Sequence, residues 1–493
     1  MKLQLALTIV MSAAESLLYN GCVFGWASIQ PVLVQEGYFS DACQANETTS
    51  GACLSQAEQL NLVFTVIASI PTWFLVPLGF VLERYGTWAV RTVIISLYAL
   101  GLTLTASSTP ANSWMLFVSF SLCSFSGFGL LVVDIANGNL VPKYRASVGT
   151  LMCGAFDSAT LVYLVFHELY KGGVSFESMF YGYAGLCAIF LAQTFFLTPK
   201  HTAPYTLPPG YVYGYKELPC FKSDSVNETE KEGDHASESD LSYDSFEGDG
   251  GCVGKDTMTL RECFKLVYTY TNLLHHCVIH FASTFFIGTF NIWIVTKVDA
   301  ADVDFYTTAF GATQGLGIVF SPFSGLLIDY CRRKFTGAIG AELAAFKAVT
   351  LLLYVTDSIV ILMLICSLIP SAELQIVTMA LQVLARAFIY STAAAFLTEV
   401  YPSKYFGVLY GLEQAVGGIV VLVQYPITLL VTRVLDDNFS IVHGILLGMT
   451  CLILAHPTYM LRLIKAKAAK RAEVLEKTAA TGKLSSSSAQ TRL

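Results

Sequence analysis

Hydrophobic positions along this chain form long continuous runs rather than short alternating stripes. Many of the runs reach about 20 residues, the length that an α-helix needs to cross about 30 Å of hydrocarbon. Polar and charged residues gather in the segments between the runs. The pattern predicts twelve membrane-spanning helices, at residues 5–34, 58–81, 88–106, 113–136, 147–168, 178–198, 264–296, 305–328, 348–370, 374–399, 406–431 and 441–461.

A short motif follows the second run and returns in degraded form after the eighth. The first copy, at residues 79–86, reads GFVLERYG, and the second, at residues 325–334, reads GLLIDYCRRK. A weaker echo links residues 142–149 with residues 402–407 at nearly the same displacement. Two echoes half a chain apart indicate that one half of the protein repeats the other. The two copies supply six gating candidates, that is, residues whose contacts could close one end of the protein: Gly79, Glu83, Arg84, Gly325, Asp329 and Arg332.

Lys and Arg are divided unevenly between the two sets of connecting segments. The set that includes the chain ends carries fifteen of them, and the other set carries three. Because positively charged loops stay in the cytoplasm, we expect both termini inside the cell. The chain then divides into an N-terminal six-helix half at 1–198, a cytoplasmic linker at 199–263, a C-terminal six-helix half at 264–461 and a cytoplasmic tail at 462–493.

Composition agrees with a membrane protein. Hydrophobic residues make up 54% of the chain and charged residues 13%, whereas about a quarter of the residues in a soluble protein are charged. Residues 200–262 are the exception, with thirteen acidic residues, six basic residues and few large aliphatic ones. Such a segment buries too little apolar surface to fold alone, so we expect a disordered spacer. We find no nucleophile–base pair or metal-ligand spacing, and we expect no enzyme activity, cofactor or nucleic-acid partner.

The first loop on the outer side, at about residues 35–57, contains no Lys or Arg. Asn46 begins the sequence NET, an acceptor for N-linked glycosylation. Cys43 and Cys53 lie in the same loop, where an oxidising environment favours a disulfide over two free thiols.

The motif at residues 79–86 resembles the cytoplasmic loop signature of the major facilitator superfamily, which repeats it between its eighth and ninth spans. That signature prefers Asp at the position of Glu83. Further stretches resemble solute carrier family 43: FGW at 24–26, GAFDS at 154–158, PYTLPPGY at 204–211, FIGTFN at 286–291 and AAFLT at 394–398. The resemblance implies an all-α protein of the plasma membrane, with twelve helices in two pseudo-symmetric halves and transport by alternating access.

Within that family, Asp157 and the length of the linker favour resemblance to the nucleobase-carrying branch. This branch implies facilitated, sodium-independent movement of adenine, guanine and hypoxanthine. The alternative is facilitated transport of large neutral amino acids, because Asp157 and Arg386 together offer charges for a zwitterion. A proton-coupled variant is also open, since buried carboxylates titrate near neutral pH. The intact gate motifs speak against a non-transporting receptor.

Ionisable residues inside the predicted spans are the first site candidates, because charges in hydrocarbon are costly. We expect Asp157 and Arg386 to pair across a central cavity, with Glu413 as the alternative partner of Arg386. A nucleobase is flat and neutral, so its site needs an aromatic face and a few fixed polar groups. The substrate-binding candidates are Glu15, Tyr19, Asn20, Asp157, Phe286, Asn291, Gln314, Arg386 and Tyr390.

The chain ends in Thr491, Arg492 and Leu493. A hydroxyl two residues before a terminal aliphatic side chain is the pattern that PDZ domains recognise by strand addition. We therefore predict a PDZ-domain scaffold as a partner and expect the polar tail to be extended.

Overall fold

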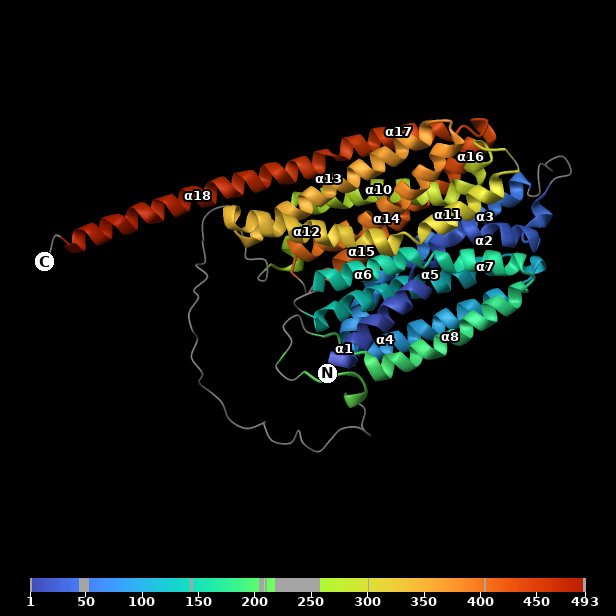
Figure 1. The fold of residues 1–493 in the computed structure, drawn as a ribbon, viewed down its shortest axis with the longest axis horizontal. Helices are drawn as coiled ribbons and strands as arrows, with labels where there is room; N and C mark the ends of the chain where they lie inside the picture. Colours follow the sequence, from blue (N-terminus) through green and yellow to red (C-terminus); the bar gives the residue numbers. More distant parts are fainter. Residues whose placement is uncertain are drawn as a thin grey trace.

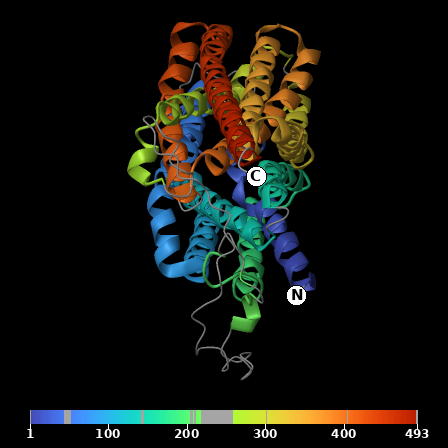
Figure 2. The same ribbon diagram turned by 90° about the vertical axis from the view of Figure 1, so that its left-hand side faces the viewer.

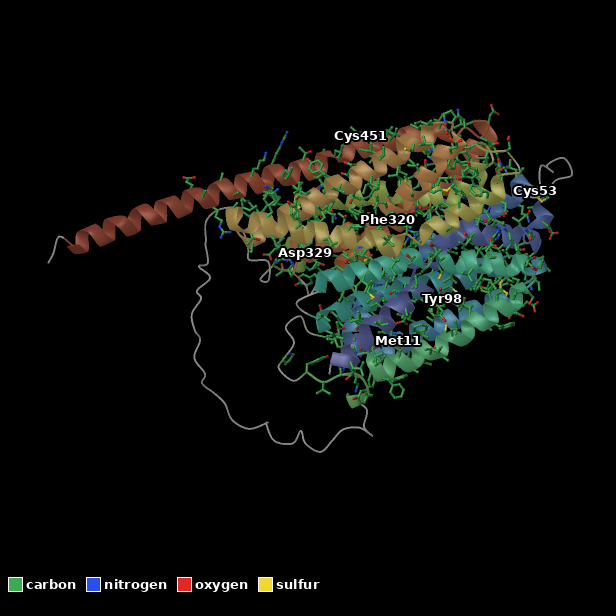
Figure 3. The ribbon with its side chains drawn as sticks, in the orientation of Figure 1. Met11, Cys53, Tyr98, Phe320, Asp329 and Cys451 are labelled. Carbon is green, nitrogen blue, oxygen red and sulfur yellow. A yellow bond between two sulfur atoms is a disulfide. The ribbon has the colours of Figure 1, made fainter. Side chains whose placement is uncertain are left out.

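The structure, a computed structural model, describes residues 2–43, 53–141, 145–203, 208, 211–217, 258–299, 301–402 and 405–490. Within these ranges it contains helices and no β-strand. The helices form an elongated bundle, and both ends of the chain lie at the same end of it (Figure 1). Cys53 lies at the opposite end (Figure 3). We call these two ends the termini face and the disulfide face, the latter after the Cys43–Cys53 bond, whose Cα atoms are 5.8 Å apart.

The N-terminal half occupies the blue-to-green part of the bundle (Figure 1). Its helices are α1 (Lys2–Glu15), α2 (Trp26–Gln35), α3 (Leu54–Trp73), α4 (Leu75–Ala106), α5 (Met115–Ala136), α6 (Arg145–Ser158), α7 (Leu161–Lys171) and α8 (Phe176–Leu197). A π-helical turn, η1 (Ser16–Asn20), and a 3₁₀ turn, η2 (Cys22–Gly25), connect α1 to α2.

The C-terminal half occupies the yellow-to-red part, and the view onto the termini face shows it above the N-terminal half (Figure 2). After the short α9 (Leu260–Cys263), its helices are α10 (Val267–Ile294), α11 (Val303–Gln314), α12 (Gly317–Ile339), α13 (Ala341–Leu368), α14 (Ala372–Val400), α15 (Phe406–Val421), α16 (Gln424–Val434), α17 (Phe439–Ile453) and α18 (Ala455–Gln490).

These helices account for the twelve predicted spans. Nine described helices are long and apolar enough to cross a membrane, and two bent pairs raise the number to eleven. The one predicted span that this count leaves out is the second, and it is separated from the third inside α4, where Gly86 interrupts the helical backbone with a φ of +80°. Glycine adopts this left-handed conformation without steric cost. α3 and the first part of α4 therefore form the second span, and the part of α4 after Gly86 forms the third.

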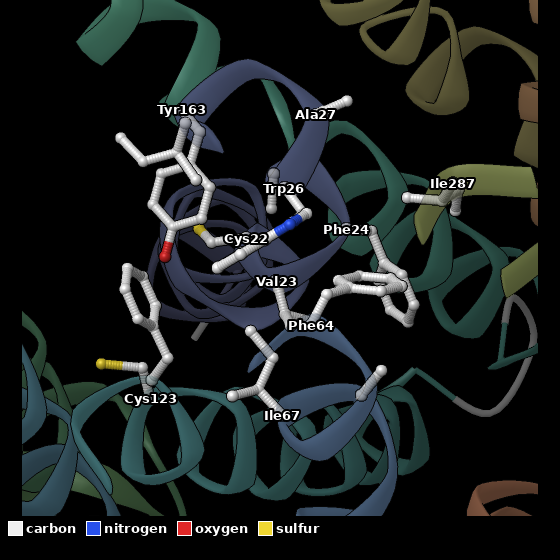
Figure 4. Close-up of a cluster of buried hydrophobic side chains, with 14 of the residues drawn as sticks. Cys22, Val23, Phe24, Trp26, Ala27, Phe64, Ile67, Cys123, Tyr163 and Ile287 are labelled. Atoms are coloured by element: carbon white, nitrogen blue, oxygen red, sulfur yellow. The ribbon is translucent and has the colours of Figure 1, made fainter. Parts of the chain in front are cut away.

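The apolar core is continuous between the two halves. Figure 4 shows Phe24, Trp26 and Phe64 close together in a buried cluster of hydrophobic side chains. The ring centroids of Trp26 and Phe64 are 6.0 Å apart, and both side chains are fully buried. Ile287 of α10 belongs to the same buried cluster. Burial of this surface favours association of the halves, because the apolar side chains exchange contacts with lipid or water for close packing against each other.

The first part of the linker is anchored to the N-terminal half. The backbone N–H of Thr87 donates to the carbonyl of Lys200 over 2.8 Å. Gln4 Nε2 donates to the carbonyl of Tyr213 over 2.9 Å. These bonds correct the expectation of a spacer that is disordered throughout, which considered only the composition of the segment. Residues 218–257 lie outside the described residues.

The tail also differs from the expectation of an extended segment. After a turn at Leu454 that follows α17, α18 begins within the last span and extends as far as Gln490. Asn46 and residues 491–493 lie outside the described residues, so the glycosylation site and the PDZ-domain ligand stay predictions.

Candidate functional site

Breaks in three spans meet near the middle of the bundle. The first span bends by 46° where η1 meets η2, and the eighth bends by 42° between α11 and α12. A Cβ atom added to Gly21 would lie 1.9 Å from the carbonyl oxygen of Phe156, and one added to Gly317 would lie 2.6 Å from Cβ of Asp157. The fifth span is itself interrupted between α6 and α7. Glycine thus permits the first and eighth spans to approach the fifth closely, and interrupted helices of this kind line the sites of many transporters.

An ion pair at this position connects the two halves. Arg386 Nε of α14 lies 2.9 Å from Asp157 Oδ1 of α6. Arg386 Nη2 also donates to the carbonyl of Asp157 over 2.6 Å. The exposed fractions of Asp157 and Arg386 are 0% and 1%. The structure therefore confirms the predicted pair, and each charge neutralises a partner that would be costly alone in a membrane interior.

The pair keeps some hydrogen-bonding capacity. In the described part of the chain, Asp157 Oδ2 and Arg386 Nη1 have no hydrogen-bond partner. A carboxylate oxygen accepts hydrogen bonds and a guanidinium nitrogen donates them. The pair therefore has one acceptor and one donor that are not used by any described residue.

Aromatic rings surround the pair. The guanidinium carbon of Arg386 lies 5.3 Å from the ring centroid of Phe24. Ring centroids are 5.9 Å apart for Phe24 and Phe156, 6.1 Å for Phe24 and Tyr390 and 5.2 Å for Phe156 and Tyr390. His280 of α10 packs edge-on against Tyr390 at 5.9 Å. These side chains come from both halves and provide apolar faces on which a flat ring could stack.

Amide side chains form a second polar group among buried residues of the C-terminal half. Gln314 Nε2 at the end of α11 donates to Gln382 Oε1 of α14 over 3.0 Å. Gln314 Oε1 has no partner among the described residues. Since Gln382 precedes Arg386 by one helical turn, this amide pair is adjacent to the ion pair along α14. Gln314 and Tyr390, both predicted from the sequence, thus belong to the same region as Asp157 and Arg386.

Three other predicted residues lie in networks inside the N-terminal half. Glu15 Oε2 is 2.5 Å from Arg91 Nη2, and Arg91 Nη1 is 3.2 Å from Asp134 Oδ1. Asn20 Nδ2 donates to Asp134 Oδ2 over 3.1 Å. The ring of Tyr19 stacks on Tyr183, with centroids 4.8 Å apart. These contacts occupy Glu15, Tyr19 and Asn20 with their own half, which favours a role in its folding.

Arg91 and Asp134 were not among the site residues predicted from the sequence. Arg91 stands near the start of the predicted third span, and its charge was counted with those of the loop before it. The structure corrects this interpretation, since Arg91 is completely buried. Asp134 lies near the end of the predicted span at 113–136. The available signal was the presence of two acidic residues and one basic residue in three different spans, because hydrocarbon tolerates such charges only when they are paired.

The two remaining candidates lie in the disulfide-face part of α10. Phe286 packs in an aromatic cluster with Trp293, at 5.2 Å between centroids, and with Phe310, at 6.3 Å. Asn291 Nδ2 donates to the carbonyl of Ala27 over 3.1 Å and also contacts Gln30 Oε1 at 2.9 Å. Asn291 therefore joins the two halves rather than approaching the ion pair.

Glu413 is not the partner of Arg386 in this structure. Glu413 Oε1 accepts a hydrogen bond from Asn272 Nδ2 over 3.0 Å. It also lies 3.6 Å from His276 Nδ1. The alternative partner that the sequence left open is thus engaged within the C-terminal half, together with a span-seven histidine.

Polar contacts on the disulfide face close the halves against each other. Glu58 of α3 forms an ion pair with Arg433 of α16, and Thr432 Oγ1 donates to Glu58 Oε1 over 2.9 Å. Lys171 Nζ at the end of α7 lies 2.9 Å from Asp304 Oδ1 of α11. Both ion pairs join the N-terminal half to the C-terminal half.

The two motif glycines lie at contacts between the halves toward the termini face. A Cβ atom on Gly79 would be 3.6 Å from the backbone of Gly407, at the start of α15. One on Gly325 would be 3.1 Å from Thr150 Oγ1 of α6. The position of Gly325 therefore favours a residue without a side chain, as close helix packing requires, whereas a Cβ atom on Gly79 would make an ordinary van der Waals contact.

The charged motif residues make fewer contacts. Glu83 and Arg84 are exposed, and the guanidinium carbon of Arg84 lies 5.8 Å from the ring centroid of Tyr85. Asp329 is half-buried. Arg332 Nη1 lies 3.6 Å from Glu399 Oε1 of α14. The predicted gating role of these residues stays a hypothesis.

Comparisons with known proteins agree with this geometry. The model of the Major Facilitator Superfamily matches residues 16–423. Equilibrative nucleobase transporter 1 from Bos taurus is 31% identical over 484 residues, which cover 94% of this chain and 97% of that protein. Large neutral amino acids transporter small subunit 3 from Homo sapiens is 24% identical, with 84% of this chain and 85% of that protein covered.

Among solved structures, a mutant of the nucleoside transporter NupG aligns with a TM-score of 0.51. The alignment covers 92% of this chain and 99% of the NupG chain at 15% identity, so it supports a similarity of fold and nothing more. The family match, the full-length relatives and the two six-helix halves together show that the chain is a multi-pass membrane transporter of the major facilitator superfamily and belongs, within it, to solute carrier family 43.

Proposed function

We propose that this protein is a facilitative, sodium-independent transporter of purine nucleobases, with adenine, guanine and hypoxanthine as substrates. The observation that carries the proposal is the Asp157–Arg386 pair, which joins the halves and retains one acceptor and one donor. A purine carries ring N–H donors and ring-nitrogen acceptors on one flat edge. The available atoms of the pair match such an edge, and Phe24, Phe156 and Tyr390 supply faces for stacking.

We further propose that transport proceeds by alternating access around this pair. Opening toward the disulfide face requires separation of Glu58 from Arg433 and of Lys171 from Asp304. Opening toward the termini face requires separation at Gly79 and Gly325. Rocking of two halves around a midplane site is the usual mechanism for this architecture. In this proposal the termini face is cytoplasmic and the protein lies in the plasma membrane, consistent with the distribution of Lys and Arg.

Transport of large neutral amino acids is the second candidate function, and the same pair is the reason to test it. A zwitterion needs a fixed partner for each of its charges, and Asp157 and Arg386 carry one of each sign. In the structure these charges neutralise each other. An amino acid would have to separate Asp157 from Arg386 to pair with each charge. A neutral base would only have to form hydrogen bonds with Asp157 Oδ2 and Arg386 Nη1, the atoms without a partner among the described residues.

Uptake measurements distinguish the candidates. In cells that produce this protein, we expect labelled adenine uptake to saturate, to be unchanged when choline replaces sodium and to equilibrate without accumulation. Labelled leucine should enter no faster than in control cells. Leucine uptake without adenine uptake would assign the protein to amino-acid transport. Adenine accumulation driven by an acid exterior, tested at two external pH values, would instead indicate proton coupling.

A further inference from the structure

A small cavity lies between α13 and α18 on the termini face, outside the central site. Its volume is about 150 Å³. We call it the basic pocket, and its lining consists of Glu342, Leu343, Phe346, Leu463, Ile464, Lys467 and Arg471. Four of these side chains are apolar, two are cationic and one, Glu342, is acidic. The pocket thus combines an apolar floor with a positively charged rim.

Packing holds both cations of the rim in place. A Cβ atom on Gly340 would lie 2.3 Å from Arg471 Nη1, so the guanidinium rests against the turn between α12 and α13. Gly340 has a φ of +85°, and its missing side chain leaves room for this approach. Lys467 Nζ lies 5.7 Å from the ring centroid of Phe346. Contact with an aromatic face stabilises an ammonium group.

The surroundings of the basic pocket carry a clear excess of positive charge. Exposed cations follow the apolar parts of α12 and α18: Arg332, Arg333, Lys334, Arg462, Lys465 and Lys470. The acidic residues on the same stretches of α12, α13 and α18 are Asp329, Glu342 and Glu473, and Glu399 of α14 lies against Arg332. The local field therefore attracts anions.

The position along α18 places the pocket at the level of lipid headgroups. The apolar run of the last span extends through α17 into the start of α18, and Leu452 on it is 76% exposed, as expected of a lipid-facing side chain. On α18 the lining of the pocket begins at Leu463, directly after Arg462, the first cation of this helix. The preference of cytoplasmic loops for Lys and Arg accounts for the positive charge of this part of α18. It does not account for a cavity with an apolar floor beneath two of its cations.

We propose that the basic pocket binds one anionic glycerophospholipid of the cytoplasmic leaflet. Its phosphate lies on Lys467 and Arg471, and the glycerol and first acyl carbons lie on Leu343, Phe346 and Leu463. Cationic pockets between spans on the cytoplasmic side recognise such headgroups, and charge-assisted bonds from Arg to phosphate are strong. The cytoplasmic placement rests on the orientation proposed above. A bound lipid joins the α12–α13 turn to α18, two parts of the C-terminal half.

Thermal unfolding of the purified full-length protein in neutral detergent tests this site. We expect dioctanoyl phosphatidylserine to raise the unfolding temperature by a few degrees, because a ligand that binds only the folded state stabilises it. Dioctanoyl phosphatidylcholine, inorganic phosphate and phosphoserine are expected to leave it unchanged at the same concentration. An equal rise with phosphatidylcholine would contradict recognition of the headgroup charge. An equal rise with phosphate or phosphoserine would show an anion site rather than a lipid site.

The double substitution Lys467→Gln and Arg471→Gln is expected to remove the rise caused by phosphatidylserine. The matched control is Lys465→Gln with Lys470→Gln, which removes the same charge from exposed positions on the same helix and should keep the rise. An equal loss in both variants would show that net charge alone matters and would overturn the proposal. Should the first variant fail to fold, the single substitution Lys467→Gln is compared with Lys465→Gln by the same criterion.

Discussion

Replacement of Asp157 by Ala is expected to destabilise the protein severely and to abolish nucleobase uptake. The substitution leaves Arg386, which is 1% exposed, without its counter-charge. Removal of one member of a buried ion pair costs about 3–5 kcal/mol. Combining Asp157→Ala with Arg386→Ala removes the stranded charge, so the double variant should regain part of the lost stability while uptake stays impaired. Unfolding of the purified variants and their uptake rates measure the two effects separately.

The exposed pair Lys171–Asp304 provides the control for this cycle. It also connects the two halves, over 2.9 Å, but its side chains are 37% and 67% exposed. Exposed pairs contribute about 0–1 kcal/mol, so the same cycle there should give a coupling energy of that size. If the Asp157 and Arg386 substitutions were simply additive, the buried contact would carry no energy and the proposed centre of the transporter would be wrong.

Replacement of Gly21 by Ala is the second substitution for which we expect a large effect. The added Cβ would lie 1.9 Å from the carbonyl oxygen of Phe156, and neither backbone can move without separating the first span from the fifth. Overpacking of this kind costs about 1–3 kcal/mol and sometimes more. Because Asp157 is the next residue on α6, displacement there should also disturb its contact with Arg386. We therefore expect lower unfolding temperature and strongly reduced uptake.

The control for Gly21 is Gly182→Ala on α8. No heavy atom lies within 4 Å of a Cβ added at Gly182, so helix propensity alone should act there, and Ala favours a helix over Gly by about 1 kcal/mol. Stability equal to or above that of the wild type is expected. A harmless Gly21→Ala substitution would mean that the first and fifth spans are not in contact at this position.

The number of spans could be predicted from the sequence because each hydrophobic run must match the membrane thickness. The contact between Asp157 and Arg386 was also predictable, since two opposite charges at similar depth are costly apart. Hydrophobicity says nothing about breaks inside a span. The close approach at Gly21 and Gly317 depends on which helices are neighbours, and only the structure provides that.

The sequence also could not show which aromatic residues lie at the site or that the linker is anchored. Tyr19 and Phe286 have the residue type expected of a nucleobase site, yet each packs with aromatic rings of its own half. Aromatic side chains are common in this chain, with 33 Phe and 25 Tyr, so residue type alone could not separate them from Phe156 and Tyr390. The anchoring of Lys200 to Thr87 was invisible for another reason, because it uses backbone groups that any sequence carries.

Binding of labelled adenine to the purified protein tests most directly that nucleobases bind beside the Asp157–Arg386 pair. We expect saturable binding that hypoxanthine displaces and leucine does not. Phe156→Leu should weaken it at least several-fold, since stacking of a base on an aromatic ring is worth about 1–3 kcal/mol, whereas Phe286→Leu should leave it nearly unchanged. Displacement by leucine but not by hypoxanthine, or weaker binding in Phe286→Leu than in Phe156→Leu, would contradict the account.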